Sequence, residues 1–328
     1  MTISLCWRRK FQGVDEIVFA SDSRLSAGYR WDCAQKIFPI EGPNFCISFA
    51  GDSDFGFPVI FQFQCMVRNY RRYANGAAPI SEMTKDFLAI VNQMASLVDD
   101  RVLAQFTKTS FLIGGYHFDS GAIYQRIVRY NNITAKYERD NFGGLQSGGK
   151  GFRVGFIGDE YAAYFKILGN LINKQQTELN FQPLEALSIL LRSQDRNSAI
   201  GGSPQVVKVY RHRNYLPYAI RTASTDDGVT LFGRPLLSYE RTFYPVIALD
   251  RFGEADFVHY PDMRKSRTLQ PPPKIGEPPK RVTRRHDVES ADKISRSRGD
   301  AIQISAPPHS TSGAATPSAH HSPPDPDS

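Results

Sequence analysis

The stretch FASDSR, at residues 19–24, ends a run of apolar residues with an acid, a serine and an arginine. The chain also alternates from residue 2 to residue 7, where one face carries Ile3, Leu5 and Trp7 and the other carries Thr2, Ser4 and Cys6. This is the period of a half-buried strand. Because only a polar turn at residues 8–13 separates the two runs, they predict a β-hairpin that returns Asp22 to the side of Thr2.

Thr2 follows the first methionine. Methionine is normally removed when the next residue is small, so we expect the mature protein to begin with Thr2, which then carries a hydroxyl and a free α-amine. An α-amine titrates near pH ~7.7–8 and can take the hydroxyl proton at neutral pH. This is the chemistry of a threonine N-terminal nucleophile. Many chains begin Met-Thr, so the dipeptide alone decides nothing.

Two further residues fit such a nucleophile. Lys36 leads the apolar run at residues 37–40 and would point into the same cavity if that strand pairs with the first. Its charge can lower the proton affinity of a nearby hydroxyl, and an aspartate can hold it charged. Gly51 ends the run at residues 44–52, where its N–H can donate to an oxyanion. The alternatives are a solvated lysine at a strand edge and an ordinary turn glycine.

Four residues now stand in the order of a known family. The segment at residues 2–60 resembles the proteasome β-subunit family of N-terminal nucleophile (Ntn) hydrolases, including its bacterial relatives. In that family the site consists of an N-terminal threonine, an aspartate and a lysine at the ends of strands, and a glycine after an apolar strand. The residues that match are Thr2, Asp22, Lys36 and Gly51.

The rest of the globular part agrees with that family in layout. The predicted elements are two amphipathic helices at residues 54–74 and 81–103, two strands at 111–118 and 123–130, and two helices that begin near Asp159 and Pro183. Ser81 and Asp159 are the expected helix caps. The order predicts an α+β fold with two packed, mainly antiparallel sheets between helical layers, the four-layer αββα sandwich of the family.

Two loops depart from the family pattern. At residues 143–151 the family carries a serine close to the nucleophile, so either Ser147 fills that role or Lys150 has replaced it. In the later turn, Asn197 stands where an aspartate is expected and Ile200 where a serine is expected. Asparagine brings no negative charge, and isoleucine offers no hydrogen bond. These two residues favour a weakly active or inactive protein.

A substrate pocket is expected beside the four matched residues. The positions that flank them are Leu25, Ala34, Phe38, Phe49 and Ser53. Because they are mostly apolar, such a pocket would prefer a hydrophobic side chain on the acyl side of the cleaved bond. The alternative is that Phe38 and Phe49 belong to the core.

Composition predicts the domain organisation. No aromatic residue follows Tyr260, and 11 of the 21 prolines lie in residues 271–326. Residues 261–328 therefore predict a disordered, Pro/Ser-rich basic tail, which lacks the apolar surface needed to offset chain entropy. One proteasome-like domain remains at residues 1–260, and within it residues 226–260 predict an added hairpin.

Charge and cysteine content exclude several classes. Of the net charge of +7, residues 263–328 hold +4 and residues 1–262 hold +3, which is too little for a nucleic-acid footprint. The four cysteines have no C-x-x-C spacing and the first segment lacks a signal-peptide core, so a cytoplasmic location is expected. No run approaches the about eighteen apolar residues of a membrane span. No metal-like cluster or phosphate loop is present, so no metal or cofactor is expected.

The sequence therefore predicts an enzyme, a threonine-type hydrolase of peptide or other amide bonds. The hydroxyl of Thr2 attacks the carbonyl, its amine relays the proton, Lys36 held by Asp22 stabilises charge, and the N–H of Gly51 binds the oxyanion. The resemblance implies a peptide or protein substrate and self-assembly into rings or stacks, and it leaves an ATPase unfoldase partner open. The alternatives are a catalytically weak or inactive scaffold subunit and a small-molecule amidase.

Overall fold

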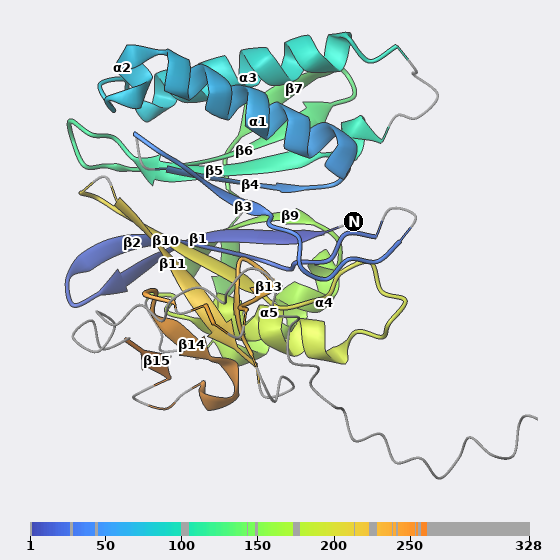
Figure 1. Cartoon of the computed structure of the whole chain (residues 1–328), viewed down its shortest axis with the longest axis vertical. Helices are drawn as coiled ribbons and strands as arrows, with labels where there is room; N and C mark the ends of the chain where they lie inside the picture. Colours follow the sequence, from blue (N-terminus) through green and yellow to red (C-terminus); the bar gives the residue numbers. More distant parts are fainter. Residues whose placement is uncertain are drawn as a thin grey trace, which may run out of the picture. The chain divides into compact units, whose positions relative to one another are not determined.

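The chain is a mixed α+β protein in which two sheets carry helices (Figure 1). The computed structural model describes residues 2–260 except 27–28, 43–44, 100–104, 143, 148–149, 173–177, 213, 223–227, 238, 241, 253 and 255–256. One compact unit spans Met1–Pro272. The predicted tail at residues 261–328 lies outside the described residues.

The larger sheet is formed by ten of the described strands. They are β1 (Ile3–Phe11), β2 (Val14–Ser21), β8 (Gly144–Ser147), β9 (Lys150–Gly158), β10 (Gln205–Tyr210), β11 (Asn214–Arg221), β12 (Val229–Leu231), β13 (Arg234–Pro235), β14 (Val246–Ala248) and β15 (Val258–His259). The main path runs β13-β12-β11-β10-β2-β1-β9-β8, while β14 lies beside β11 and pairs with β15. Neighbouring strands are antiparallel except β11 and β14, which are parallel.

The smaller sheet has five of the described strands, in chain order and antiparallel throughout. They are β3 (Ile37–Ile40), β4 (Phe45–Ala50), β5 (Ser110–Tyr116), β6 (Ile123–Asn131) and β7 (Lys136–Asp140). The predicted strand pair before and after residues 119–121 is confirmed as β5 and β6. The strand after Lys36 does not pair with the first strand, because β3 pairs with β4 in this second sheet.

The helices are α1 (Ser53–Asn69), α2 (Arg71–Ala74), α3 (Ile80–Ser96), α4 (Tyr161–Leu171) and α5 (Gln182–Ser193), with short 3-10 turns at Phe106–Lys108 and Leu249–Arg251. The first predicted helix is divided in two because Tyr70 adopts an extended conformation. Ser81 is not a cap, since Pro79 holds that position and no side chain caps the helix. Pro183 lies in the first turn of α5, as predicted. No helix among the described residues is long and apolar enough to cross a membrane.

The β1–β2 hairpin is confirmed, with Ser4 opposite Ser21 and Phe11 opposite Val14. The strands extend further into the polar segment than expected, and the turn contains only Gln12 and Gly13, both with positive φ. Two such residues form the tight turn whose twist matches the flanking strands. The hairpin brings the residue after β2 back to the residue before β1.

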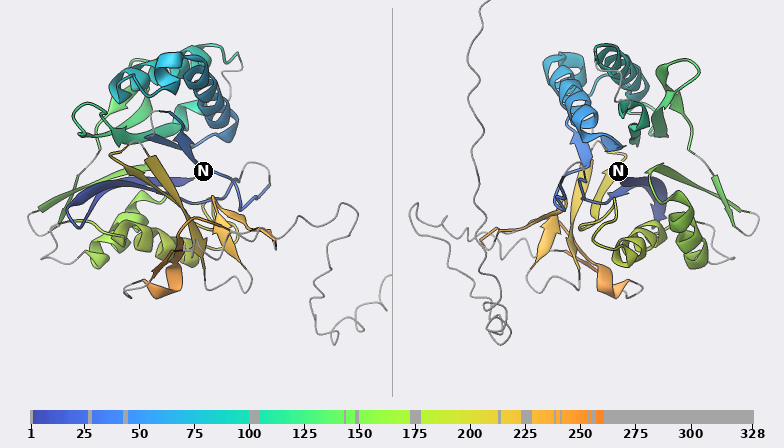
Figure 2. Two further views of the ribbon diagram at one scale, coloured as in Figure 1. Left: turned by 60° about the vertical axis from the view of Figure 1, so that its left-hand side comes forward. Right: turned by 90° about the vertical axis from the view of Figure 1, so that its right-hand side faces the viewer.

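Alternation along β1 separates two cores. Ile3, Leu5 and Trp7 are fully buried in a cluster that includes side chains of α4 and α5, whereas Cys6 lies in a second cluster drawn from strands of both sheets. A third cluster joins the smaller sheet to α1 and α3. Both views in Figure 2 show α1 and α3 against the smaller sheet and α4 and α5 against the larger. The polar face of β1 therefore points toward the smaller sheet.

Candidate active site

A buried lysine joins the N-terminal strand to the residues after β2. Lys36 Nζ donates to Thr2 Oγ1 at 2.8 Å and to Asp22 Oδ1 at 2.8 Å. It also donates to the carbonyl oxygen of Arg24. The side chains of Lys36 and Asp22 are fully buried, and Thr2 is 1% exposed. Three residues that lie 14 to 34 positions apart in sequence thus share one solvent-excluded cluster.

Lys36 reaches this cluster from the segment before β3, where a glutamine of the other sheet fixes its backbone. Gln205, the first residue of β10, accepts from the Lys36 N–H at 3.0 Å. Its Nε2 donates to the carbonyl oxygens of Asp22 at 3.1 Å and of Ala34 at 2.6 Å. Gln205 is fully buried, so every polar atom of its side chain needs a partner. The sequence did not single out this glutamine, since its partners are remote in the chain.

Asp22 is held by donors on both carboxylate oxygens. Oδ1 accepts from the N–H of Ile3 at 3.1 Å in addition to Lys36, and Oδ2 accepts from the N–H groups of Arg24 at 3.2 Å and Gly201 at 3.1 Å. An ionised carboxylate only accepts hydrogen bonds, so four donors suit that form. Asp22 therefore orients the lysine rigidly beside Thr2.

The proton on Lys36 is held less firmly than that on an exposed lysine. Burial lowers the pKa of Lys36 from its ordinary value, while the charge of Asp22 and its hydrogen bond oppose that shift. A buried ammonium next to a hydroxyl favours the deprotonated form of that hydroxyl. The pair thus supplies positive charge where an alkoxide would develop.

Asp159 is a second acid at Thr2. Its Oδ2 accepts from the backbone nitrogen of Thr2 at 2.9 Å, and its N–H donates to the carbonyl oxygen of Thr2 at 2.9 Å. The predicted capping role of Asp159 is wrong, because Glu160 is the N-cap of α4 and its side chain makes no cap hydrogen bond. The pairing of β1 with β9 aligns Ile3 with Gly158 and so turns Asp159 toward Thr2.

Gly158 allows the backbone at the end of β9 to lie close to Thr2. It has φ +104, and a Cβ at this position would overlap the carbonyl oxygen of Thr2 and lie 3.2 Å from Cβ of Ala50. The close approach to Ala50 shows that the end of β4 lies on the same side as Thr2.

Gly51 follows directly after β4 and has φ +121. A Cβ there would lie 2.5 Å from Cα of Thr109, so the close approach of that backbone already requires glycine. The next residue, Asp52, donates its N–H to Thr109 Oγ1 at 3.0 Å. The placement of Gly51 near the end of β4 is consistent with the expected position, and its oxyanion role stays a prediction.

The structure describes in part the two loops that depart from the family pattern, at residues 143–151 and 196–202. Ser147 ends β8, its backbone paired with Lys150, and the side chains of both lie outside what the structure describes. Asn197 is exposed, and its Oδ1 accepts from Arg30 Nη2 at 2.8 Å. Ile200 is fully buried in the cluster under α4 and α5.

The turn at residues 196–202 nevertheless contacts Asp22 and Arg24 through its backbone. Besides the Gly201 N–H, the carbonyl oxygen of Ser198 accepts from Arg24 Nη1 at 2.9 Å. Arg24 also donates from Nε and Nη2 to the two carboxylate oxygens of Asp32, at 2.6 and 2.9 Å. The hydrogen bond from Arg24 holds the pKa of Asp32 below its usual range. Arg24 is therefore a positioning residue that ties this turn to the end of β2.

The residues expected to wall a pocket fall into two groups. Phe38 and Phe49 are buried in the cluster under α1 and α3, where Phe49 packs against Gly56, so they occupy core positions. Ala34 is buried, while Leu25 and Ser53 are half-buried.

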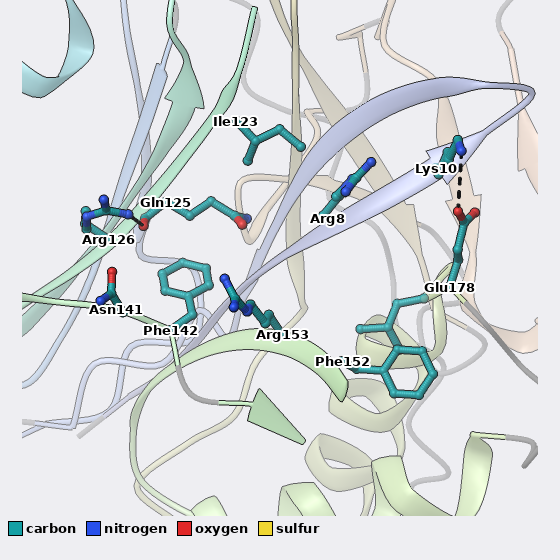
Figure 3. Close-up of a pocket in the computed structure, with 11 residues that line it drawn as sticks. Arg8, Lys10, Ile123, Gln125, Arg126, Asn141, Phe142, Phe152, Arg153 and Glu178 are labelled. Carbon is teal, nitrogen blue, oxygen red and sulfur yellow. Dashed lines mark hydrogen bonds and ion pairs between the residues drawn. The ribbon is translucent and has the colours of Figure 1, made fainter. Parts of the chain in front are cut away.

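Two cavities among the described residues have volumes of about 500 and 900 Å³ and are considered as substrate sites (Figure 3 shows the smaller one). Neither is lined by Thr2, Asp22, Lys36 or Gly51. The larger one has walls from residues 32–33 and 202–204, next to the positions that hold Arg24 and Asp22. Among the described residues, no group of three or more His, Cys, Asp or Glu side chains is placed to hold a metal ion.

The chain was compared with family models, curated proteins and solved structures. No family model matches the sequence, and no curated protein matches it. Among solved structures, the chain is similar to Anbu (ancestral beta-subunit) from Yersinia bercovieri, at 15% identity and a TM-score of 0.47, over 66% of this chain and 87% of that one. The function proposed below therefore depends on the geometry of the site itself.

Proposed function

We propose that this chain is a threonine-type Ntn hydrolase that cleaves amide bonds. The observation that carries the proposal is the contact of Lys36 Nζ with both Thr2 Oγ1 and Asp22 Oδ1 inside a solvent-excluded cluster. The proposed architecture is the four-layer αββα sandwich, with the catalytic domain at residues 1–260 and the tail at 261–328. The proposed location is the cytoplasm.

The mechanism begins with removal of Met1, which gives Thr2 a free amine. The Thr2 hydroxyl then attacks the amide carbonyl while the amine accepts the hydroxyl proton and passes it to the leaving nitrogen. Lys36 stabilises the developing alkoxide, held in place by Asp22. The N–H of Gly51 donates to the oxyanion, an interaction of a kind that is worth about 10²–10³ in rate. Water then releases the acyl group.

Asp159 gives the freed amine a fixed partner. The Thr2 nitrogen already donates to this carboxylate at 2.9 Å as a peptide nitrogen. As an ammonium it would make a charge-assisted hydrogen bond with the same partner. We therefore assign Asp159 the role of positioning the Thr2 amine. Leu25, Ala34 and Ser53 remain the proposed walls of the acyl-side pocket.

The test is an intact-mass measurement of the untagged protein before and after exposure to an epoxyketone, an electrophile that reacts with an N-terminal threonine. We expect loss of Met1 and one adduct that maps to Thr2, and no adduct on the Thr2→Ala variant. Retained Met1, or a free Thr2 that never reacts while the protein is folded, would exclude the enzyme.

An inactive scaffold subunit is the second candidate, because Asn197 is exposed and Ile200 offers no hydrogen bond. A small-molecule amidase is the third, since the same nucleophile serves both reactions. Cleavage of denatured casein but not of simple anilides supports the peptidase, and the reverse supports the amidase. The proposed self-assembly into rings or stacks, with or without an ATPase partner, is tested by light scattering on the purified protein.

A further inference from the structure

Two buried serine hydroxyls near the candidate active site have no hydrogen-bond partner among the described residues. Ser4 lies on β1, two residues after Thr2, and Ser48 lies on β4, two residues before Ala50. Both serines are fully buried. Buried polar groups in native proteins are bonded to protein or to ordered water, because an unpaired one is costly. The partner of these two hydroxyls therefore has to come from outside the described side chains and backbone.

Ser4 points into the layer between the two sheets. Cys6, on the same face of β1, belongs to the cluster drawn from strands of both sheets, and so does Ile157, which lies opposite Ser4 on β9. On its other side, Ser4 lies opposite Ser21 of β2. Side chains directly opposite on antiparallel strands have Cβ atoms about 4.5–5.5 Å apart, so the hydroxyls of Ser4 and Ser21 are neighbours.

Ser48 faces the same layer from the smaller sheet. Cys46 and Ala50, two residues to either side of it on β4, belong to the same cluster. The residues opposite Ser48, which are Ile37 on β3 and Leu112 on β5, belong to it as well. The side chain of Ser48 therefore points toward the larger sheet.

Contacts at the two ends of β4 show which part of β1 it crosses. At its last residue, a Cβ on Gly158 would lie 3.2 Å from Cβ of Ala50, and Gly158 pairs with the first residue of β1. Toward its start, Cys46 pairs with Gly114 of β5, and a Cβ on Gly114 would lie 3.3 Å from Cys6 Sγ. The strand β4 thus passes over β1 between its first residue and Cys6.

Ser48 lies midway between these contacts on β4, and Ser4 lies between them on β1. Their hydroxyls therefore face each other across the layer, without a direct hydrogen bond. The ammonium of Lys36 does not bond to them, because its three hydrogen bonds go to other atoms of the candidate site. Two facing hydroxyls that do not bond directly are suited to a bridging water.

We propose that Ser4, Ser21 and Ser48 bind one ordered water molecule between the sheets. The Ser21 hydroxyl donates to the carbonyl oxygen of Ile3 at 2.9 Å, so its oxygen serves the water as an acceptor. The water accepts from Ser4 and Ser48 and donates to Ser21, which gives it about three hydrogen bonds, the usual number for a buried water. The assignment does not depend on the proposed hydrolase activity.

High-resolution crystallography of the full chain tests this site directly. We expect one water peak within hydrogen-bond distance of Oγ of Ser4, Ser21 and Ser48, and we expect the peak to be lost or displaced in Ser48→Ala. No peak between the hydroxyls, or hydroxyls bonded to protein atoms in its place, would overturn the proposal.

A double-mutant cycle tests the shared water in solution. Ser4→Ala and Ser48→Ala each remove one of its partners, so each should lower the urea midpoint of unfolding. The double variant should lower the midpoint by clearly less than the sum, because both changes act on the same water. Additive shifts would overturn the bridge. A raised midpoint in either single variant would also overturn it, since that is the effect of removing a hydroxyl that has no partner.

Ser188→Ala supplies the matched control. Ser188 is 2% exposed and lies on α5, where its Oγ accepts from Arg192 Nη2 at 3.1 Å. Combined with Ser4→Ala, it should give additive shifts, because the two serines share no partner. A departure from additivity as large as that of Ser4→Ala with Ser48→Ala would show a general effect of buried serines and would overturn the shared water.

Discussion

At the scale of single residues, Lys36 determines how the Thr2 hydroxyl is presented. One ammonium touches both the hydroxyl oxygen and the carboxylate of Asp22, at 2.8 Å each. No water is needed to connect the three groups. The position of this ammonium is fixed by Gln205, which holds the Lys36 backbone, and by the carbonyl oxygen of Arg24.

Lys36→Met should lower the rate of epoxyketone labelling at Thr2 by about 10²-fold or more, as expected for loss of a charge that assists proton transfer. It should also destabilise the fold by about 3–5 kcal/mol, because Asp22 is left buried without its cation. Labelling kinetics by mass spectrometry and urea unfolding measure the two effects. Unchanged labelling in a folded variant would exclude a role for Lys36 in the chemistry.

The variant Asp159→Asn tests the role of Asp159 separately from that of Asp22. A carboxylate favours the protonated form of a nearby amine, and only the neutral amine can act as the base. Removing that charge should therefore move the pH dependence of labelling toward lower pH, while Thr2 stays in place through its carbonyl. Rates measured from pH 5 to 10 would test this, and a shift toward higher pH would contradict the assigned role.

At the scale of strands, a buried ion triad crosses β1, β2 and β10. Arg9 Nη1 lies 2.6 Å and Lys208 Nζ 3.2 Å from the same Glu16 oxygen. Burial lowers the pKa of Lys208 to about 8, although the charge of Glu16 opposes the shift. The triad therefore places a titrating group inside the sheet that carries Thr2.

This triad predicts a pH-dependent stability. Between pH 8 and 10.5 the unfolded chain binds more protons at Lys208 than the folded chain. The free energy of unfolding should therefore rise with pH over that window, by up to roughly 3 kcal/mol from this group. The measurement is urea unfolding of the wild type and of Lys208→Met at pH 7.5 and 10. An equal difference between the two proteins at both pH values would contradict it.

Gly13 and Gly158 both have positive φ, so their alanine variants compare backbone strain alone with strain plus a steric overlap. Gly13 has φ +82 and open space around its Cβ position, whereas a Cβ on Gly158 would overlap the Thr2 carbonyl. Gly13→Ala should cost about 1–2 kcal/mol from backbone strain and leave labelling of Thr2 unchanged. Gly158→Ala should impair both stability and labelling. Calorimetry together with the labelling assay distinguishes the two variants. Normal labelling of Gly158→Ala would show that the position of Asp159 does not depend on the close contact between Gly158 and Thr2.

The separation in sequence between interacting residues determines how much of the structure could be predicted. The β1–β2 hairpin was predictable, because the alternation and the polar turn between the two strands lie within about twenty positions, although the turn itself is shorter than the sequence indicates. The path of Lys36 was not, since its strand joins the other sheet and its backbone partner Gln205 lies 169 residues away. The local sequence does not distinguish Asp159 from a helix cap. Its partner, Thr2, is 157 residues distant.

At the scale of the whole molecule, the C-terminal strands determine where the folded part can be cut. Ile247 is fully buried and Leu249 is 4% exposed, both in the cluster that joins the larger sheet to α4 and α5. A chain that ends at residue 260 should keep the melting temperature of the full protein. One that ends at residue 245 should melt several degrees lower, since each lost side chain contributes about 1.5–3 kcal/mol. Scanning calorimetry on both truncations tests the proposed domain boundary, which fails if the longer one is destabilised.

The ion pair between Lys36 and Asp22 also holds the two sheets in place relative to each other. It joins the segment entering one sheet to the end of a strand in the other, so neither sheet can slip along its neighbour without exposing a buried charge. Selection for a foldable chain alone would retain this pair, whereas only selection for chemistry would retain the hydroxyl beside it. A Thr2→Val variant keeps this ion pair and removes the hydroxyl, so the requirements of folding and of the proposed chemistry can be tested separately at one oxygen atom.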